Sequence, residues 1–413
     1  MIYGCIGERL KHSFSKEIHE KISDYSYEIR EIERESLKDF ILSKDFKGIN
    51  VTIPYKEKVI PWLDFIDDSA KEIGAVNTVV NKDGKLYGYN TDFAGLKELI
   101  LKSEIVIKGK TVLVLGSGGT AKTAQSVLNY FEAGKIITVS RKSSENTITY
   151  EEAEVLYKDS ADVIVNTTPV GMFPDCDSSP INLDKYKNIS GVIDVIYNPL
   201  ETKLVADAKK RGIKGANGLY MLVSQAVYAS GYFKGIESDT KVTDKVFNEI
   251  LREKKNIVLT GMPGCGKTTV GKLLAKITGK DFIDSDEVIT EKYGHPSEII
   301  NSEGEKCFRA IESKVIKELS SLNGKIIATG GGVVLKEENI ESLKRNSVIF
   351  FIDRSIEDIK PTKDRPLSQS KELLEKLYRE RIGIYKSSCH YAINGNCSPD
   401  ETAKKIKEHF YEN

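Results

Sequence analysis

A glycine-rich turn between a short apolar run and an amphipathic stretch constrains the fold of this chain more than any other feature. Residues 261–269 read GMPGCGKTT, directly after the apolar run 257–259 and before a helical pattern over 270–277. A strand that leads into such a turn, followed by a helix, directs backbone N–H groups and one lysine at phosphate oxygens. The spacing predicts a nucleotide site, with the Thr268 hydroxyl as a ligand of Mg²⁺, formed by Gly264, Cys265, Gly266, Lys267, Thr268 and Thr269.

Short apolar runs alternate with helix-length amphipathic stretches throughout the 413 residues, a length that suits two or three domains. This alternation predicts an α/β protein with parallel sheets. The phosphate-binding loop begins only after residue 255, and the polar stretch 237–255 keeps a helical period, so we expect a domain boundary near Lys254 and Lys255. The expected strands are 111–115, 136–139, 163–166, 192–195, 257–259, 325–328 and 348–352.

The composition limits the classes of binding partner and the cellular compartment that we expect. Lys+Arg and Asp+Glu both number 61, so the net charge is zero, which argues against nucleic acid or a membrane surface as the main partner. The six cysteines form no C-x-x-C pair, which indicates free thiols in a reducing compartment. No apolar run reaches the roughly 18 residues that span a bilayer, and the N-terminus has no signal-peptide pattern. We therefore expect a cytoplasmic protein.

A second glycine-rich turn lies in the first half of the chain. Strand 111–115 runs into GSGGTA over 116–121, a helix follows, and a second strand ends at Val139. This is the G-x-G-x-x-A pattern of a dinucleotide site. The residues after the second strand are Ser140, Arg141 and Lys142, where an NAD site usually has an acid. Two cations suit the 2′-phosphate of NADP; a structural turn beside a solvated basic pair is the alternative.

Four polar segments precede this turn, each at an expected strand end or loop: HSFS at 12–15, GINVTIPYK at 48–56, GAVNT at 74–78 and GYNTD at 88–92. A lysine and an aspartate in one cleft, here Lys56 and Asp92, can form a proton-transfer pair. Taken singly, each segment is equally compatible with an ordinary turn.

Four further clusters follow the phosphate-binding loop. The acids of DSD, 284–286, can serve a metal and a substrate hydroxyl; GGG, 330–332, lets a ligand approach the backbone; and DRPL, 364–367, suits a mobile lid. Arg309 and Glu312 lie three apart on one helix face, so the acid can orient the guanidinium. Arg309 and Arg381 together suit a carboxylate, which indicates an acidic substrate. Taken one at a time, these acids and arginines are equally compatible with solvent-exposed positions on the surface.

The first 250 residues or so resemble shikimate dehydrogenases. The resemblance rests on eight ordered motifs, which include NTTPVGM at 166–172, DVIYNP at 194–199 and GLYMLVSQ at 218–225. It implies NADPH-dependent reduction of 3-dehydroshikimate by a catalytic pair, Lys56 and Asp92. It also implies that Ser13 and Ser15 hold the substrate carboxylate, and that the ring hydroxyls are bound by Thr52, Asn77, Tyr197 and Gln225. The cofactor would be lined by Gly116, Ser117, Gly118, Gly119, Thr120, Ser140, Arg141, Lys142, Val195 and Gly218.

Two positions depart from the dehydrogenase pattern. Lys16 stands where the family usually has proline, a change that should not affect the neighbouring serine hydroxyls. The family often has Asn-Arg-Thr where this chain has Ser140, Arg141 and Lys142. The arginine is kept, and with it the expected preference for NADP.

From Asn256 onward the chain resembles shikimate kinases. This implies that Lys267 and Thr268 serve ATP and Mg²⁺, with Asp284 near the metal through water, and that Arg365 on the lid stabilises charge on the transferred phosphoryl group. The segment between Asp353 and Arg365 is a few residues shorter than the family pattern, and an arginine that usually stacks on adenine is not evident there. Shikimate would be bound by Asp286, Arg309, Gly331, Gly332 and Arg381.

Together these motifs predict an α/β substrate-binding and catalytic domain (1–100 and 219–254), a Rossmann NADP-binding domain (101–218) and a P-loop kinase domain with a parallel sheet (255–413). The predicted function is reduction of 3-dehydroshikimate to shikimate and its phosphorylation to shikimate 3-phosphate, in aromatic amino acid biosynthesis. The alternatives are an NAD-dependent quinate/shikimate dehydrogenase, a kinase for another small polyol, and a non-catalytic sensor of the metabolite. Three observations argue against these in turn. No acid follows the second strand, the arginine pair implies an acidic substrate, and the catalytic lysines and aspartates are all present. The sequence is compatible with an oligomer.

Overall fold

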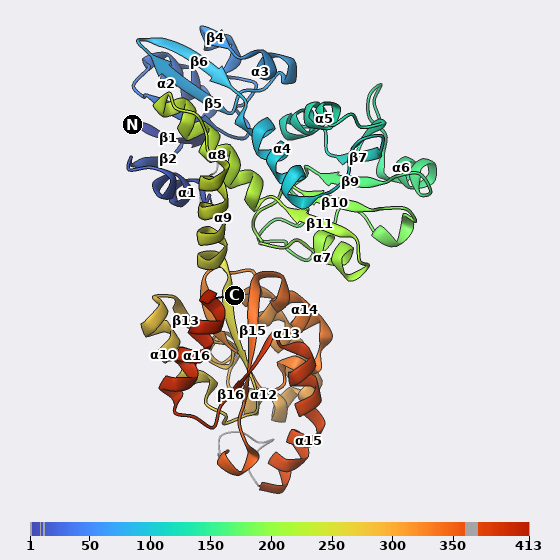
Figure 1. Ribbon diagram of the computed structural model, residues 1–413. Helices are drawn as coiled ribbons and strands as arrows, with labels where there is room; N and C mark the ends of the chain where they lie inside the picture. The colour runs from blue at the N-terminus through green and yellow to red at the C-terminus, as the bar shows by residue number, and fades with distance from the viewer. Residues whose placement is uncertain (1, 9, 11–12, 360–370, 413) are drawn as a thin grey trace. The chain divides into compact units, whose positions relative to one another are not determined.

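The computed structural model of the chain describes residues 2–8, 10, 13–359 and 371–412. The chain folds into two compact units, Met1–Ile250 and Leu251–Asn413. The division falls in the last turns of helix α9 (Thr240–Lys254). The first unit holds two sheets and the second holds one (Figure 1). The predicted α/β architecture with parallel sheets is confirmed. In the part of the chain that the structure describes, no helix is long and apolar enough to cross a membrane.

The first sheet of the first unit carries the polar segments that precede residue 100. Its strand order is β2-β1-β3-β5-β6-β4, and β5 runs antiparallel to both of its neighbours. The register pairs Asn50 on β3 with Thr78 on β5, which places the segments 48–56 and 74–78 side by side. The elements are β1 (Tyr3–Gly7), α1 (Ser15–Ile22), β2 (Tyr27–Glu31), α2 (Leu37–Ser43), β3 (Gly48–Val51), β4 (Phe65–Ile66), α3 (Asp68–Ile73), β5 (Thr78–Lys82) and β6 (Lys85–Tyr89).

The second sheet is parallel, with the order β11-β10-β9-β7-β8. Strands covered on both faces read as continuous apolar runs, which is why these strands could be predicted. Helix α5 buries residues at helical spacing against β7, among them Ala121, Ala124 and Leu128. The elements are β7 (Thr111–Leu115), α5 (Gly119–Tyr130), β8 (Lys135–Val139), α6 (Tyr150–Tyr157), β9 (Val163–Asn166), β10 (Gly191–Asp194), α7 (Lys203–Lys210) and β11 (Lys214–Asn217).

Two helices, α4 (Thr91–Ser103) and α8 (Leu219–Lys234), pack against each other and join the two sheets of the first unit (Figure 1). Gly95 permits this close packing, since a Cβ there would lie 2.6 Å from the Met221 carbonyl oxygen. Met221 belongs to the core of the second sheet, whereas Phe233, at the other end of α8, belongs to a core of the first. Residues on α4 and α8 are thereby held where the two sheets meet.

The second unit has one parallel sheet, with the order β13-β14-β12-β15-β16. Strand β12 lies at the centre and all five of its residues are buried. Because the strands are parallel, the loops that follow β12, β13, β14 and β15 emerge at the same edge of the sheet. The elements are β12 (Asn256–Thr260), α10 (Lys267–Thr278), β13 (Asp281–Asp284), α11 (Ser285–Tyr293), α12 (Pro296–Glu303), α13 (Glu305–Ser320), β14 (Lys325–Ala328), α14 (Glu337–Asn346), β15 (Ser347–Asp353), α15 (Lys371–Ser388), β16 (Tyr391–Asn394) and α16 (Pro399–Glu412).

Candidate active sites

Lys56 and Asp92 form an ion pair in the first unit. Lys56 follows β3, and Asp92 lies in the first turn of α4, where the helix dipole favours a carboxylate. The Lys56 Nζ atom is 2.5 Å from Asp92 Oδ2, and the two side chains are only 15% and 12% exposed. An ammonium group held against a carboxylate in this way can pass a proton to or from a bound molecule.

The thiol of Cys5 lies close to this pair. Cys5 is buried on β1 and interacts electrostatically with both Lys56 and Asp92. Burial raises the pKa of the thiol to about 12, so it carries no charge near neutral pH. Sequence reasoning did not find Cys5, because only the pairing of β1 with β3 brings it to the site.

A buried hydrogen-bond network holds two of the residues predicted to bind ring hydroxyls. The Asn77 Oδ1 atom accepts from the Thr91 backbone N–H at 2.7 Å, and its Nδ2 atom donates to Thr91 Oγ1 at 3.1 Å. The same hydroxyl donates to Gln225 Oε1 at 3.4 Å. Thr91 was not singled out from the sequence, although it lies within a quoted motif. Its position at the start of α4 lets it contact residues from β5 and α8.

The structure also brings together the two serines and the tyrosine of the predicted substrate site. Ser13 Oγ donates to Ser15 Oγ at 2.9 Å, and the ring of Phe14 lies 5.2 Å from that of Tyr197. Burial raises the pKa of the Tyr197 hydroxyl to about 12, and Ser13 is its hydrogen-bond partner. Thr52 follows β3 and donates its backbone N–H to the β1 carbonyl oxygen of Ile6.

A cavity of about 1160 Å³ joins the Lys56 side chain to the second glycine-rich turn. Helix α5 starts after Gly118 with no side-chain cap, so its first N–H groups are available to a ligand. A Cβ on Gly118 or Gly119 would meet nothing within 4 Å, which leaves the backbone open to close approach. These features fit a pyrophosphate at the helix N-terminus. The predicted cofactor residues that line the cavity are Gly116, Ser117, Gly118, Gly119, Thr120, Ser140, Arg141 and Lys142.

Val195 and Gly218 lie outside the lining of this cavity, next to each other. A Cβ on Gly218 would lie 2.0 Å from the Val195 carbonyl oxygen, so only glycine fits there. The loop that starts at Val195 is held by the buried carboxylate of Asp194. Asp194 accepts hydrogen bonds from the Ile196 backbone and from the side chains of Asn166 and Thr202 at 2.8–3.1 Å. Burial nevertheless raises the pKa of Asp194 to about 6.

In the second unit, the turn after β12 forms the expected phosphate-binding loop. Gly266 has a φ of +99°, a conformation that favours glycine. Lys267 Nζ donates to the carbonyl oxygens of Gly261 and Met262 at 2.9 and 3.0 Å. Thr268 Oγ1 donates to Asp284 Oδ2 at 2.7 Å. A hydroxyl and a carboxylate beside the phosphate position suit Mg²⁺, which takes few protein ligands.

Cys265, also predicted to touch the nucleotide, is buried beneath this loop. Its Sγ atom lies 3.9 Å from Lys267 Nζ. Gly264, Gly266, Lys267, Thr268 and Thr269 line the adjoining cavity, whereas Cys265 does not.

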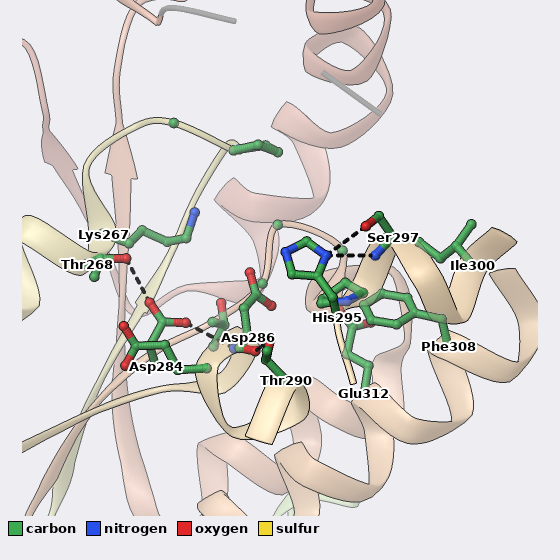
Figure 2. Close-up of a pocket in the computed structure, with 18 of the residues that line it drawn as sticks. Lys267, Thr268, Asp284, Asp286, Thr290, His295, Ser297, Ile300, Phe308 and Glu312 are labelled. Carbon is green, nitrogen blue, oxygen red and sulfur yellow. Dashed lines mark hydrogen bonds between the residues drawn. The ribbon is translucent and has the colours of Figure 1, made fainter. Parts of the chain in front are cut away.

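That cavity, of about 800 Å³, extends from the phosphate-binding loop to helices α11, α12 and α13. In Figure 2, Lys267 and Thr268 lie on one side, His295 and Phe308 on the other, and Asp286 between them. The sequence pattern did not point to His295, Ser297 or Phe308. The other lining residues include Asp284, Asp286, Arg309, Glu312, Gly330, Gly331, Gly332 and Arg381.

The buried base of this cavity carries the two predicted carboxylate-binding arginines. Arg309 Nη1 donates to both carboxylate oxygens of Glu312, at 2.9 and 3.0 Å. Burial acts to lower the pKa of Arg309, but the charges of Glu312 and Glu305 outweigh it and hold the pKa above its ordinary value. Arg381 Nη1 donates to the Gly331 carbonyl oxygen at 3.1 Å, and Tyr385 donates to the same oxygen at 2.5 Å.

The glycines of this site leave room for charged side chains. A Cβ on Gly332 would lie 2.0 Å from Arg309 Nη1, and one on Gly330 would lie 2.6 Å from Asp286 Oδ1. An alanine at either position would push the Arg309 guanidinium or the Asp286 carboxylate away from its present place. Arg365, the predicted lid arginine, lies outside the described residues.

The two units thus define a dinucleotide-binding α/β enzyme joined to a P-loop kinase. Comparison with known proteins identifies the family that each of the two units resembles. Residues 5–79 match the family model "Shikimate dehydrogenase substrate binding domain", and residues 263–411 match the model "Shikimate kinase". A shikimate dehydrogenase (NADP(+)) of Clostridium beijerinckii is 40% identical over 267 residues, which cover 61% of this chain and 99% of that protein.

Solved structures agree with this assignment. A shikimate dehydrogenase from Peptoclostridium difficile is 36% identical, with a TM-score of 0.56, over 60% of this chain and 97% of the other. A shikimate 5-dehydrogenase from Thermus thermophilus, in complex with NADP(H) and shikimate, is 28% identical, with a TM-score of 0.54. The match covers 60% of this chain and 99% of the other. The chain belongs to the shikimate dehydrogenase family and carries a shikimate kinase domain after the dehydrogenase.

Proposed function

We propose that this chain catalyses two consecutive reactions, reduction of 3-dehydroshikimate to shikimate with NADPH and phosphorylation of shikimate to shikimate 3-phosphate with ATP and Mg²⁺. The observation that supports the proposal is that each unit brings predicted catalytic groups and a nucleotide-binding turn to one cavity. Lys56, paired with Asp92, lines the same cavity as the glycine-rich turn and Arg141, whereas Asp286 and Arg309 line the same cavity as Lys267.

In the dehydrogenase unit, bound NADPH supplies the hydride that reduces the ketone. Lys56 donates a proton to the oxygen that gains negative charge, and Asp92 holds the ammonium group in place. In the reverse direction the pair removes the proton. Ser13, Ser15, Thr52, Asn77, Tyr197 and Gln225 fix the acid and the hydroxyls of the substrate, so positioning contributes much of the rate. Arg141 and Lys142 provide the charge that favours NADP over NAD.

In the kinase unit, the shikimate carboxylate binds Arg309 and Arg381, and Asp286 accepts the proton of the attacking hydroxyl. Lys267 and the first N–H groups of α10 stabilise charge on the phosphates, and Thr268 and Asp284 hold Mg²⁺. We assign the lid role to Arg365 on the resemblance alone. Six free cysteines agree with a reducing compartment, and we propose that the enzyme works in the cytoplasm.

Two substitutions test whether the sites are independent. Lys56→Ala should abolish reduction and leave phosphorylation of added shikimate intact, and Lys267→Ala should do the reverse. Lys38→Ala, at an exposed position on α2, is the matched control and should affect neither. Loss of both activities in one folded variant would contradict the proposal. If neither substitution lowers its activity, Lys56 and Lys267 are not the catalytic groups; absence of both activities from the parent protein would favour a sensor.

A further inference from the structure

His295 lies on the wall of the kinase cavity across from the phosphate-binding loop (Figure 2). It stands between α11 and α12, where it is the N-cap residue of α12, and its side chain is exposed. The same cavity is lined by Lys267 and Asp286. The imidazole therefore borders the space in which we expect the phosphoryl acceptor.

The start of α12 determines which nitrogen of the His295 ring carries the proton. The Nδ1 atom accepts a hydrogen bond from the Ser297 backbone N–H at 3.4 Å, and the Ser297 hydroxyl lies 2.7 Å from the same atom. A ring nitrogen that accepts from a backbone N–H has no proton of its own, so the proton of the neutral imidazole is on Nε2. The Nε2–H group is thus a hydrogen-bond donor, and it has no acceptor in the part of the chain that the structure describes.

This free donor faces the reacting part of the cavity. Figure 2 shows the nitrogen that contacts Ser297 on one edge of the ring and the other nitrogen on the opposite edge, on the side of Asp286 and Lys267. Asp286 lies between the phosphate-binding loop and His295 in this view. An acceptor held by Asp286 therefore has the phosphates on one side and the imidazole on the other.

Two hydroxyls of shikimate have no side-chain partner in the proposed kinase reaction. Arg309 and Arg381 bind the carboxylate, and Asp286 accepts the proton of the hydroxyl that attacks ATP. Shikimate has two more ring hydroxyls, and the oxygen of each can accept an N–H. His295 offers the complementary donor in the same cavity.

We propose that His295 is a further specificity-determining residue of the kinase, which donates its Nε2–H to a ring hydroxyl that is not phosphorylated. This inference rests on the proposed kinase function. An acceptor that lacks this hydroxyl loses the hydrogen bond, so the imidazole favours a polyhydroxylated acid over a less hydroxylated one. A neutral hydrogen bond of this kind contributes about 3- to 10-fold in binding.

Competition in the kinase assay of the full-length chain tests the proposal. Shikimate 3-phosphate is measured by mass spectrometry with 4-deoxyshikimate or 5-deoxyshikimate as the competitor, which gives a competition constant whether or not the analogue is itself phosphorylated. His295→Asn should raise the KM for shikimate about 3- to 10-fold and leave kcat unchanged. The analogue that lacks the bound hydroxyl should have the same competition constant with the parent and with the variant.

The choice of asparagine separates binding from helix capping. Its side-chain oxygen can still accept from the Ser297 N–H at the start of α12, whereas its shorter side chain does not reach the position of Nε2. His409→Asn, at an exposed position on α16 outside the cavity lining, is the matched control and should change none of the three constants. An unchanged KM for ATP would show that His295→Asn is folded.

The outcomes distinguish this proposal from the kinase function on which it rests. An unchanged KM for shikimate in His295→Asn would remove His295 from the acceptor site. Equal weakening of shikimate and of both analogues would mean that the imidazole contacts neither hydroxyl. Either result overturns the proposal. A parent chain that forms no shikimate 3-phosphate would instead refute the kinase function.

Discussion

The buried carboxylate of Asp194 should make the stability of the dehydrogenase unit depend on pH in an unusual direction. Burial raises the pKa of Asp194 from 3.8 to about 6, which outweighs its three hydrogen-bond donors. At about 1.4 kcal/mol for each tenfold change in acid dissociation, this rise corresponds to about 3 kcal/mol. The native state holds the proton more tightly than the unfolded state, so this group's contribution to stability falls as the pH rises from about 4 to 6.

Asp194→Asn removes this titration and preserves the contacts. An amide oxygen can still accept from the Ile196 N–H and from Asn166, and the amide group can donate to the Thr202 hydroxyl. Urea unfolding of the full chain, followed by fluorescence of Trp62, measures the relevant free energy. Trp62 is the single tryptophan of the chain and lies in the dehydrogenase unit. The stability of the parent relative to Asp194→Asn should fall by about 3 kcal/mol between pH 4 and pH 7.

A surface aspartate provides a control of opposite sign. The pKa of Asp159 is lowered by its hydrogen bond to Lys187, so the parent should gain stability relative to Asp159→Asn as the pH rises. This effect should be small, since the pair is exposed. A difference between parent and Asp194→Asn that is independent of pH, or that grows with pH, would refute the reasoning about burial.

Three further substitutions test other contacts. Gly332→Ala places a Cβ against Arg309 and should lower kcat/KM for shikimate about 100-fold in the kinase assay. Gly383→Ala, which has open space around its Cβ, is the control and should leave kcat/KM unchanged. Equal effects of the two substitutions would contradict the steric argument. Lys280→Met removes the three hydrogen bonds that the Lys280 ammonium group donates to the backbone carbonyl oxygens of Arg252, Glu253 and Lys255. It should destabilise the kinase unit by about 3 kcal/mol in calorimetry of the full chain, and an unchanged transition would contradict this. Thr91→Val should raise the KM for 3-dehydroshikimate about 10-fold and Thr91→Ser should restore it; a loss that serine does not restore would mean that the hydroxyl is not responsible.

Local strand–turn–helix segments were predictable because each carries its own signals. The apolar runs of β7 and β12 are continuous, as expected for strands buried on both faces, and the glycines that follow permit the turns. The α/β class and the family followed from these segments. Some element ends differ from the expected ones by one to three residues; for example α10 begins at Lys267, although its apolar pattern starts at residue 270.

Contacts between distant segments were beyond sequence reasoning. Cys5 reaches the Lys56–Asp92 pair because β1 pairs with β3, and Thr91 bridges Asn77 and Gln225 because α4 packs on α8. No local pattern encodes either packing. The roles of the individual site residues, and the division of the first unit into domains at residues 100 and 218, stay predictions that mutation must test.

The central claim is that one chain performs both reactions, and product analysis by mass spectrometry tests it most directly. The purified chain is incubated with 3-dehydroshikimate, NADPH and Mg-ATP, and each cofactor is omitted in turn. Our account predicts shikimate with NADPH alone and shikimate 3-phosphate only when both cofactors are present. If neither cofactor is consumed, or if shikimate accumulates without phosphorylation in the complete mixture, the bifunctional account is wrong.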